Sequence, residues 1–189
     1  MRRFALALAA VTWALPATAQ DFHQALQTYY ETSLTGWSTD PVLIGAIRAQ
    51  NATTSAYSAD QVAALDRSWQ AEIGNANQPT ITPILHNPAA DFLRGQVESS
   101  GGRITEVILM DGAGLNVAVT GITSDMWQGD EAKFTETYGH GPGSVHIGEV
   151  EFDESTGRYQ GQISFPLVDP ANGEMVGAMT VGVDAELIQ

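Results

Sequence analysis

The order of apolar and polar residues divides the chain into a helical first half and a strand-rich second half. From residue 21 to residue 98, apolar side chains recur at three- and four-residue spacing, the repeat of an amphipathic helix. Two helix starts carry caps: Asp40 precedes Pro41, and Ser58 is followed three residues later by Gln61, which makes a capping box. The pattern predicts helices over 21–34, from 41, over 58–74, and from 88 through Leu93.

The spacing changes at Ile104, where β-rich and alternating segments begin. Asp-Gly, Thr-Gly and Asn-Gly pairs lie in the turns between these segments and favour hairpins. The connection between the second and third segments, which we call the crossover, is polar and reads as loop and short helix over 124–138. The pattern predicts an α+β fold with one antiparallel sheet and a pocket under the crossover. The five predicted strands are 104–110, 115–120, 145–152, 159–168 and 175–183.

The N-terminus has the features of a secretory signal. Arg2 and Arg3 precede an apolar run that ends at Leu15, and Ala17-Thr18-Ala19 follows the small-x-small cleavage pattern. The alternative is an uncleaved membrane anchor, but the run is short for a hydrocarbon layer of about 30 Å. We therefore expect a signal peptide over 1–19, a periplasmic or secreted location, and one domain over 20–189. Within it, 20–98 is mainly helical and 103–184 forms the sheet and the pocket.

Composition excludes several classes of function. The chain has 22 acidic and 8 basic residues, for a net charge of −14, and such a surface repels nucleic acid and anionic lipid. It has no cysteine, so neither a disulfide nor a thiolate metal site exists. The four histidines lie in four different predicted elements, which argues against a zinc site. No nucleophile elbow, Walker loop or His-Glu-x-x-His is present, so we expect no metal and no cofactor.

Several short segments in this order resemble the Cache family of extracellular, PAS-like sensor domains. They are the N-terminal helix, the strand turn at 110–114, the crossover segment Thr-Ser-Asp-Met-Trp-Gln-Gly-Asp-Glu-Ala-Lys-Phe at 123–134, and the two strand segments 165–169 and 176–184. The resemblance covers most of the chain after residue 19 and is strongest over 103–184.

The resemblance implies a five-stranded antiparallel sheet with a long N-terminal helix on one face. It also implies that the crossover covers the other face and that a small organic ligand binds between them. Cache domains usually sit outside a membrane-bound kinase, cyclase or chemoreceptor. Because no second membrane segment or cytoplasmic module is evident in this sequence, the resemblance points to a free-standing periplasmic version. Such a domain would signal through a separate membrane-bound protein.

The crossover holds the first candidate binding residues. By resemblance, Trp127 and the adjacent Gln128 line the pocket, where an indole face holds an apolar group or a cation; the alternative is a Trp that packs the crossover onto the sheet. Asp125 and Asp130 are carboxylates that can bind an amine or a hard cation, or can cap the short helix. For Glu131 we favour capping.

Two further carboxylates are implicated only by the resemblance. Asp153 and Asp184 occupy positions similar to those that bind the amino group of the ligand in amino-acid-binding Cache domains. The family's Arg, which would pair with a ligand carboxylate, is absent, because Asp125 and Met126 stand in its place. The resemblance therefore favours a cationic, amine or neutral polar ligand over a standard α-amino acid. For Asp153 the alternative is an ordinary hairpin residue.

Three aromatic residues complete the predicted site. Tyr138, Tyr159 and Phe165 are candidate pocket walls, with core packing as the alternative, and Tyr159 and Phe165 share one sheet face by strand parity. Tyr29, Tyr30 and Trp37 extend the apolar side of the first helix and suggest a homodimer. The main hypothesis is a ligand-binding sensor without enzymatic activity. The alternatives are a secreted hydrolase that uses a carboxylate pair such as Asp125 and Asp130, and a ligand-free structural or adaptor protein.

Overall fold

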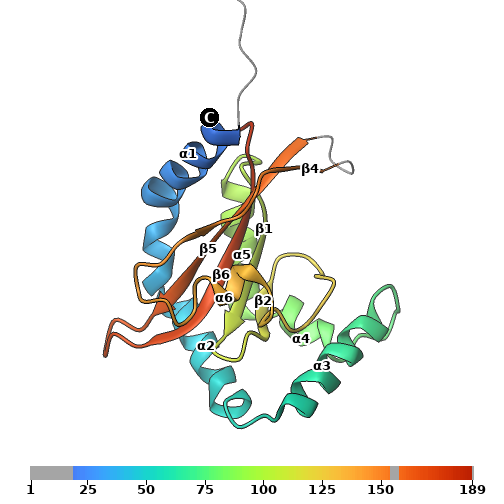
Figure 1. The fold of residues 1–189 in the computed structure, drawn as a ribbon. Coiled ribbons are helices and arrows are strands. Elements are labelled where there is room, and N and C mark those ends of the chain that lie inside the picture. The colour runs from blue at the N-terminus through green and yellow to red at the C-terminus, as the bar shows by residue number, and fades with distance from the viewer. Residues whose placement is uncertain (1–18, 154–157, 189) are drawn as a thin grey trace, which may run out of the picture.

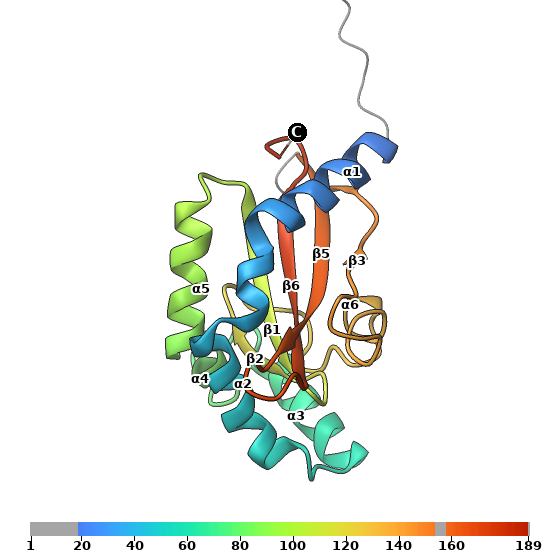
Figure 2. The ribbon, with the colours of Figure 1, turned by 90° about the vertical axis from the view of Figure 1, so that its left-hand side faces the viewer.

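The computed structural model describes residues 19–153 and 158–188, and the predicted signal peptide lies outside them except for Ala19. Its central feature is one antiparallel sheet with helices on both faces (Figures 1 and 2). The helices are α1 (Ala19–Tyr29), η1 (Tyr30–Leu34), η2 (Thr35–Thr39), α2 (Pro41–Thr54), α3 (Ala59–Glu72), α4 (Ile81–Leu85), α5 (Pro88–Ser99) and α6 (Ala132–Thr135). The strands are β1 (Ile104–Asp111), β2 (Asn116–Val119), β3 (His146–Ile147), β4 (Glu151–Asp153), β5 (Arg158–Val168) and β6 (Met175–Asp184).

The sheet confirms the predicted α+β class. Its strand order is β2-β1-β6-β5-β3, and β4 also pairs with β5. One detail of the prediction is wrong: the expected strand 145–152 is split into β3 and β4, so the sheet has six strands in the part of the chain that the structure describes. Ile147 pairs with Ile163 and Glu151 pairs with Gln160, so four steps along one strand match three along the other. The extra residue is a β-bulge, which interrupts the edge strand.

The helix starts follow the sequence signals. The Asp40 side chain accepts hydrogen bonds from the amides of residues 42 and 43, and Ser58 and Gln61 form both bonds of the capping box. Helix α4 was not predicted. Its N-terminus is capped by Glu72, whose Oε2 accepts hydrogen bonds from the amides of Thr80 (2.8 Å) and Ile81 (3.0 Å). Because this cap comes from the preceding helix, local periodicity did not reveal it.

One face of the sheet packs against the N-terminal helices, as the resemblance implied. The helical run continues from α1 through η1 and η2, and α1 and η2 both contact β5. Leu26, Leu34 and Ile47 are buried against this face together with Ile163 and Val181. We call it the helix face (Figure 2).

The crossover, residues 120–145, covers part of the opposite face, and α6 contacts β5 and β6 there. A second apolar cluster lies on this side around the fully buried Trp69 of α3, with Ile108, Met110 and Met126. The Trp69 indole N–H donates to the carbonyl of Thr123 at 2.8 Å, so α3 is joined to the crossover. We call this side the crossover face. No helix among the described residues is both long enough and apolar enough to span a membrane.

Candidate functional site

Polar side chains follow the middle of the crossover face on three neighbouring strands. In β5 the even-numbered residues point away from the helix face, because side chains alternate along a strand. The register places Gln160 beside Asp184, Gln162 beside Gly182, and Ser164 beside Thr180. On the other side of β6, Glu106 pairs with Gly182. We call this set the polar strip: Glu106, Gln160, Gln162, Ser164, Thr180 and Asp184.

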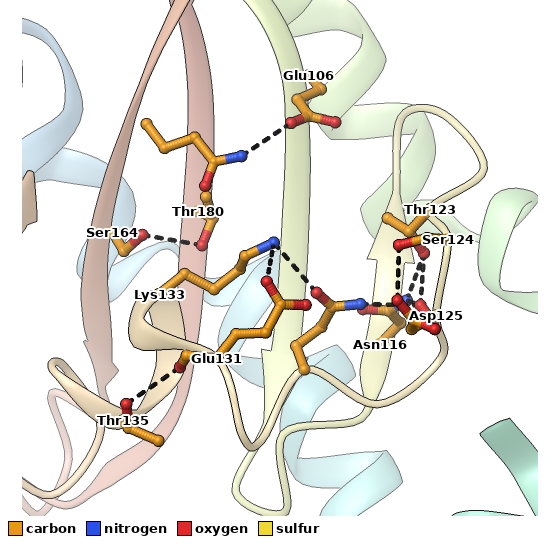
Figure 3. Close-up of polar contacts among 12 residues, drawn as sticks. Glu106, Asn116, Thr123, Ser124, Asp125, Glu131, Lys133, Thr135, Ser164 and Thr180 are labelled. Atoms are coloured by element: carbon orange, nitrogen blue, oxygen red, sulfur yellow. Dashed lines mark hydrogen bonds and ion pairs between the residues drawn. The ribbon is translucent and has the colours of Figure 1, made fainter. Parts of the chain in front are cut away.

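The centre of the polar strip is fully buried. Ser164 and Thr180 are both 0% exposed, and their hydroxyl oxygens lie 3.0 Å apart in a hydrogen bond (Figure 3). A buried hydroxyl needs a partner, because leaving it unpaired costs about 1–3 kcal/mol. The sequence thus keeps two hydroxyls in the middle of a sheet where apolar side chains would satisfy packing.

Gly182 allows two longer polar side chains to meet above β6. A Cβ at this position would lie 2.6 Å from Glu106 Cγ, so any other residue would displace that side chain. Across the gap, Gln162 Nε2 donates to Glu106 Oε1 at 3.4 Å (Figure 3). Gly182 is therefore needed for the close approach of Glu106, and its positional role is steric.

A cavity lies beside the β-bulge, at the end of the polar strip that holds Glu106, Gln160 and Gln162. This bulge cavity has a volume of about 400 Å³. Among the described residues, its charged lining consists of Glu106, Glu149 and Glu151, with no Lys or Arg. No ion pair with a described residue reaches these three carboxylates. The remaining lining residues are Gly148, Phe152, Gln160, Gly161, Gln162 and Gly182.

The crossover brings one cation to the other end. Lys133, the chain's only lysine, has a side chain 14% exposed. Its ammonium lies 3.0 Å from Glu131 Oε2 and donates to Gln128 Oε1 at 3.2 Å (Figure 3). Helix α6, which carries Lys133, contacts β5 and β6. The polar strip therefore lies between an acidic cavity and a crossover whose one cation is already paired.

The structure places the crossover candidates mainly in contacts that hold the crossover itself. Gln128 is 1% exposed, and its Nε2 donates to the carbonyl of Asp125 at 2.8 Å. The Asp125 carboxylate accepts from Gln70 Nε2 of α3 (2.7 Å) and from Ser124 Oγ (2.6 Å). Glu131 is the N-cap residue of α6, but no side-chain capping bond forms. The bond from Gln70 ties the crossover to α3, and the others lie within the crossover.

Trp127 lies away from the polar strip. Its indole N–H donates to the carbonyl of Ala113 at 2.9 Å, and its ring packs on Gly129, where a Cβ would collide with the indole Nε1. Trp127 and the exposed Asp130 line a separate cleft of about 660 Å³ against α3, which we call the Trp127 cleft. Arg67 also lines it. Of the predicted ligand residues, Trp127 and Asp130 therefore lie together, but at α3 and not over the sheet.

The predicted aromatic walls are dispersed. Phe165 is fully buried on the helix face, with its ring centroid 5.2 Å from that of Tyr30. Tyr159 is on the same face and stacks on Phe22 at 5.6 Å. Both residues therefore make the contacts of the packing alternative. Tyr138 stacks on Phe134 at 5.0 Å, and burial, followed by the nearby charge of Asp111, raises its pKa.

Of the two carboxylates suggested by the resemblance, Asp184 belongs to the polar strip. It is 2% exposed and lies 2.6 Å from Arg158, and the hydrogen bond between them, followed by their opposite charges, raises the pKa of that arginine. The backbone of Asp153 pairs with Arg158 in the β4–β5 ladder, whereas its side chain lies outside the described part. Asp184 already has a partner, so it offers a ligand less charge than the glutamates of the bulge cavity do.

Sequence reasoning missed most of the polar strip. The signal was present in the alternation Gln160, Gln162, Ser164, but alternating polar residues ordinarily mark a solvent-facing strand side. Only the crossover packed on that side makes these residues a buried polar surface. Within the described residues, no group of three or more His, Asp or Glu side chains is arranged to hold a metal ion.

No protein-family model matches the chain, and a search of curated proteins finds no match. Solved structures that it resembles include the ligand-binding domain of the Campylobacter jejuni chemoreceptor Tlp3 in complex with L-valine, at 14% identity and a TM-score of 0.41, over 88% of this chain and 65% of that one. The V. cholerae histidine kinase DctB sensor domain matches at 15% identity and a TM-score of 0.37, over 88% and 56% of the two chains.

A third similar structure is the ligand-binding domain of the Pseudomonas aeruginosa amino acid chemoreceptor PctC in complex with GABA. It matches at 15% identity and a TM-score of 0.38, over 77% of this chain and 60% of that one. The chain thus spans less than two thirds of the length of each of these structures. The structures that it resembles are thus ligand-binding and sensor domains of chemoreceptors and a histidine kinase.

Proposed function

We propose that this protein is a ligand-binding sensor domain and that its small molecule binds on the polar strip and in the bulge cavity. One observation carries the proposal: the crossover face keeps a buried hydroxyl pair and a carboxylate–amide contact next to a cavity of about 400 Å³. Small-molecule sites typically occupy about 300–1,000 Å³ and combine shape with a few placed polar groups. The bulge cavity lies within that range.

The charges of the cavity favour a ligand with an amine or another cationic group. Glu106, Glu149 and Glu151 line it, and the part of its wall that the structure describes contains no cation. An ammonium placed among them would gain charge-assisted hydrogen bonds, which are about twice as strong as neutral ones. A carboxylate ligand would meet like charge there. This agrees with the ligand class inferred from the missing Arg.

The polar strip supplies the neutral contacts of the proposed site. The Gln162 amide lines the bulge cavity and can donate to or accept from a polar ligand. The buried hydroxyl pair of Ser164 and Thr180 lies next to it in the polar strip, two residues along β5 and β6. Lys133 adds a cation that a ligand acceptor would have to share with Glu131 and Gln128. An amine that also carries a hydroxyl or an amide therefore matches the site best.

We propose binding without catalysis. The hydrolase alternative needs two carboxylates that face each other across an open cleft about 5–9 Å apart. Asp125 is held by Gln70 and Ser124, whereas Asp130 lines the Trp127 cleft, and Asp125 is not among the described residues that line this cleft. These different environments favour a structural role for Asp125.

The test is a thermal-shift screen of residues 20–189 against amines, amino acids, organic acids, ureas and divalent cations, followed by calorimetric titration. A ligand that binds only the folded state adds about 2.7 kcal/mol of stability at 100 times its dissociation constant. We expect hits among amines. Glu106→Gln should weaken them, because it keeps the shape and removes the charge. Glu98→Gln, at an exposed position on α5, is the matched control and should leave binding unchanged.

The outcome also separates the two clefts. A hit that survives Glu106→Gln and disappears on Trp127→Ala would move the ligand to the Trp127 cleft, with Asp130 beside it. If no compound in the screen stabilised the protein, the hypothesis of a ligand-free adaptor protein would replace that of a sensor, and partner capture would be the next experiment.

The remaining parts of the proposal concern cellular context. Residues 1–19 would be removed on export, and residues 20–189 would act in the periplasm as one domain. A separate membrane-bound protein would read a movement of the crossover, because ligands shift populations between conformations that they bind unequally. A homodimer through the N-terminal helix also stays a proposal. Tyr30 already packs on Phe165, so part of that apolar stripe is used within the protomer.

A further inference from the structure

A second cavity has a lining that differs in composition from the polar strip. It occupies about 600 Å³ between α2, the start of α5 and the edge strand β2. We call it the α2–α5 cleft. Its walls come mainly from small and apolar side chains: Ala46, Ala49, Leu65, Ile84, Val117 and Met126. It shares no lining residue with the bulge cavity.

The cleft lies where the two hydrophobic clusters meet. Val117 and Ala89 belong to the cluster on the helix face, and Leu115 and Met126 belong to the cluster around Trp69. All four line the cleft. An apolar molecule in this position would therefore bury surface on both clusters at once, and burial contributes about 25 cal/mol per Å² of apolar surface. At the mouth, Val42 is left 41% exposed.

The polar groups of the cleft are uncharged. Within residues 19–153 and 158–188, no Asp, Glu, Lys, Arg or His lines it, although the chain as a whole carries a net charge of −14. Gln50 uses its Nε2 to donate to Asp111 Oδ2 (2.9 Å) and to the carbonyl of Asn116 (3.1 Å). Within the described part of the chain, no hydrogen bond reaches Gln50 Oε1, Thr53 Oγ1 or the Tyr57 hydroxyl. The cleft thus combines apolar walls with a neutral acceptor and two hydroxyls.

We propose that the α2–α5 cleft is a second ligand site, separate from the polar strip, for an uncharged and mostly apolar molecule that carries one hydroxyl or carbonyl group. An anion is disfavoured by the acidic protein and finds no cation in the wall. A cation finds no carboxylate there and would lose its hydration without a partner, which is costly. A hydroxyl or carbonyl group pairs with the neutral groups of Gln50, Thr53 and Tyr57.

Occupancy of this site reaches the crossover through Met126. The amide of Met126 donates to Asp66 Oδ1 of α3 at 2.9 Å, and its carbonyl accepts from the amide of Asn116 of β2 at 2.9 Å. A ligand against the Met126 side chain therefore touches a residue that joins α3, β2 and the crossover. The second ligand would act on the same crossover from its far side.

Three probes of equal chain length test the proposal: 1-hexanol, hexanoate and hexylammonium. Each is titrated into the protein while the methyl resonance of Met126 is followed by NMR with ¹³C-methyl methionine. We expect a saturable shift with 1-hexanol and binding at least about tenfold weaker, or 1.4 kcal/mol, for the two charged probes. Equal affinity for all three probes, or no saturable shift with 1-hexanol, would overturn the proposal.

Two exposed alanines on α2 provide a matched pair of variants. Ala49 lines the cleft, whereas Ala52 is exposed and does not. Ala49→Trp should abolish the 1-hexanol shift and Ala52→Trp should preserve it; the same response in both would refute the assignment. Thr53→Val should weaken 1-hexanol several-fold by removing a hydroxyl. Amine binding that depends on Glu106 should persist in Ala49→Trp, so a failure of either site is distinguishable from a failure of the other.

Discussion

The buried hydroxyl pair of Ser164 and Thr180 allows a sharp test of the polar strip. Both residues are 0% exposed and their oxygens are 3.0 Å apart. Thr180→Val keeps the shape of the side chain but leaves the Ser164 hydroxyl buried without its partner, which costs about 1–3 kcal/mol. Ser164→Ala strands the Thr180 hydroxyl in the same way. Each single variant should therefore be less stable by about 1–3 kcal/mol.

The double variant should behave differently from the sum of its parts. When both partners of a buried hydrogen bond are replaced by apolar groups, no polar group is left unpaired and the change is close to neutral. We expect the double variant to unfold within about 1 kcal/mol of the parent, although the single costs add to about 2–6 kcal/mol. Denaturant unfolding of the four proteins, followed by circular dichroism, measures this coupling.

A surface pair with the same chemistry is the control. Thr32 and Ser33 lie exposed on η1 with their hydroxyl oxygens 3.3 Å apart. Water replaces either partner there, so Thr32→Val, Ser33→Ala and their combination should each stay within about 0.5 kcal/mol and show no coupling. Additive costs at Ser164 and Thr180 would refute the reasoning. If the double variant is stable but no longer binds the amine ligand, the hydroxyls are kept for binding and not for folding.

Three other predictions concern the fold around the site. Asp66→Ala should destabilise the protein by about 1–3 kcal/mol in denaturant unfolding, because two main-chain amides of the crossover lose their acceptor, while Asp66→Asn should cost less. A Cβ added by Gly45→Ala meets no atom within 4 Å, so this variant should stabilise α2 by about 0.5–1 kcal/mol. A Cβ added by Gly177→Ala would collide with the carbonyl oxygen of Met110, so this variant should lower the free energy of unfolding by about 1–3 kcal/mol. Burial and the Asp111 charge raise the pKa of Tyr138. The stability that this residue contributes is therefore fully present below its unfolded pKa of about 10 and is lost as pH rises through the folded value. Melting temperatures measured from pH 8 to 11 should accordingly fall less steeply in Tyr138→Phe than in the parent protein.

Local chemistry in the sequence was sufficient for most secondary structure. The caps at Asp40 and Ser58 and the change of spacing at Ile104 placed α2, α3 and β1 correctly, because each signal acts within one turn or strand. Helix α4 was not predicted from the sequence, because its cap, Glu72, belongs to the preceding helix. The split between β3 and β4 escaped because a bulge depends on the partner strand, here the step from Ile163 to Gln160.

The sequence also brought attention to the crossover but could not give the direction of its side chains. Trp127 and Asp130 share a cleft, but that cleft lies against α3 and not over the sheet. The identity of the facing element is set by long-range contacts, such as the bonds from Asp66 and Gln70 to the crossover. Such contacts leave no periodic trace in the chain.

By itself, then, the sequence determined the class of fold, the order of the strands along the chain and the existence of a crossover, because helix and strand periods are properties of short segments. The tertiary structure alone decided which polar residues form a surface. Glu106, Ser164 and Thr180 come from three strands that are neighbours only through the pairing of β1, β6 and β5. The cavity beside them is lined in part by Gly148 and Glu149, where the edge strand carries one extra residue relative to β5. That mismatch is defined only once two distant segments are in register.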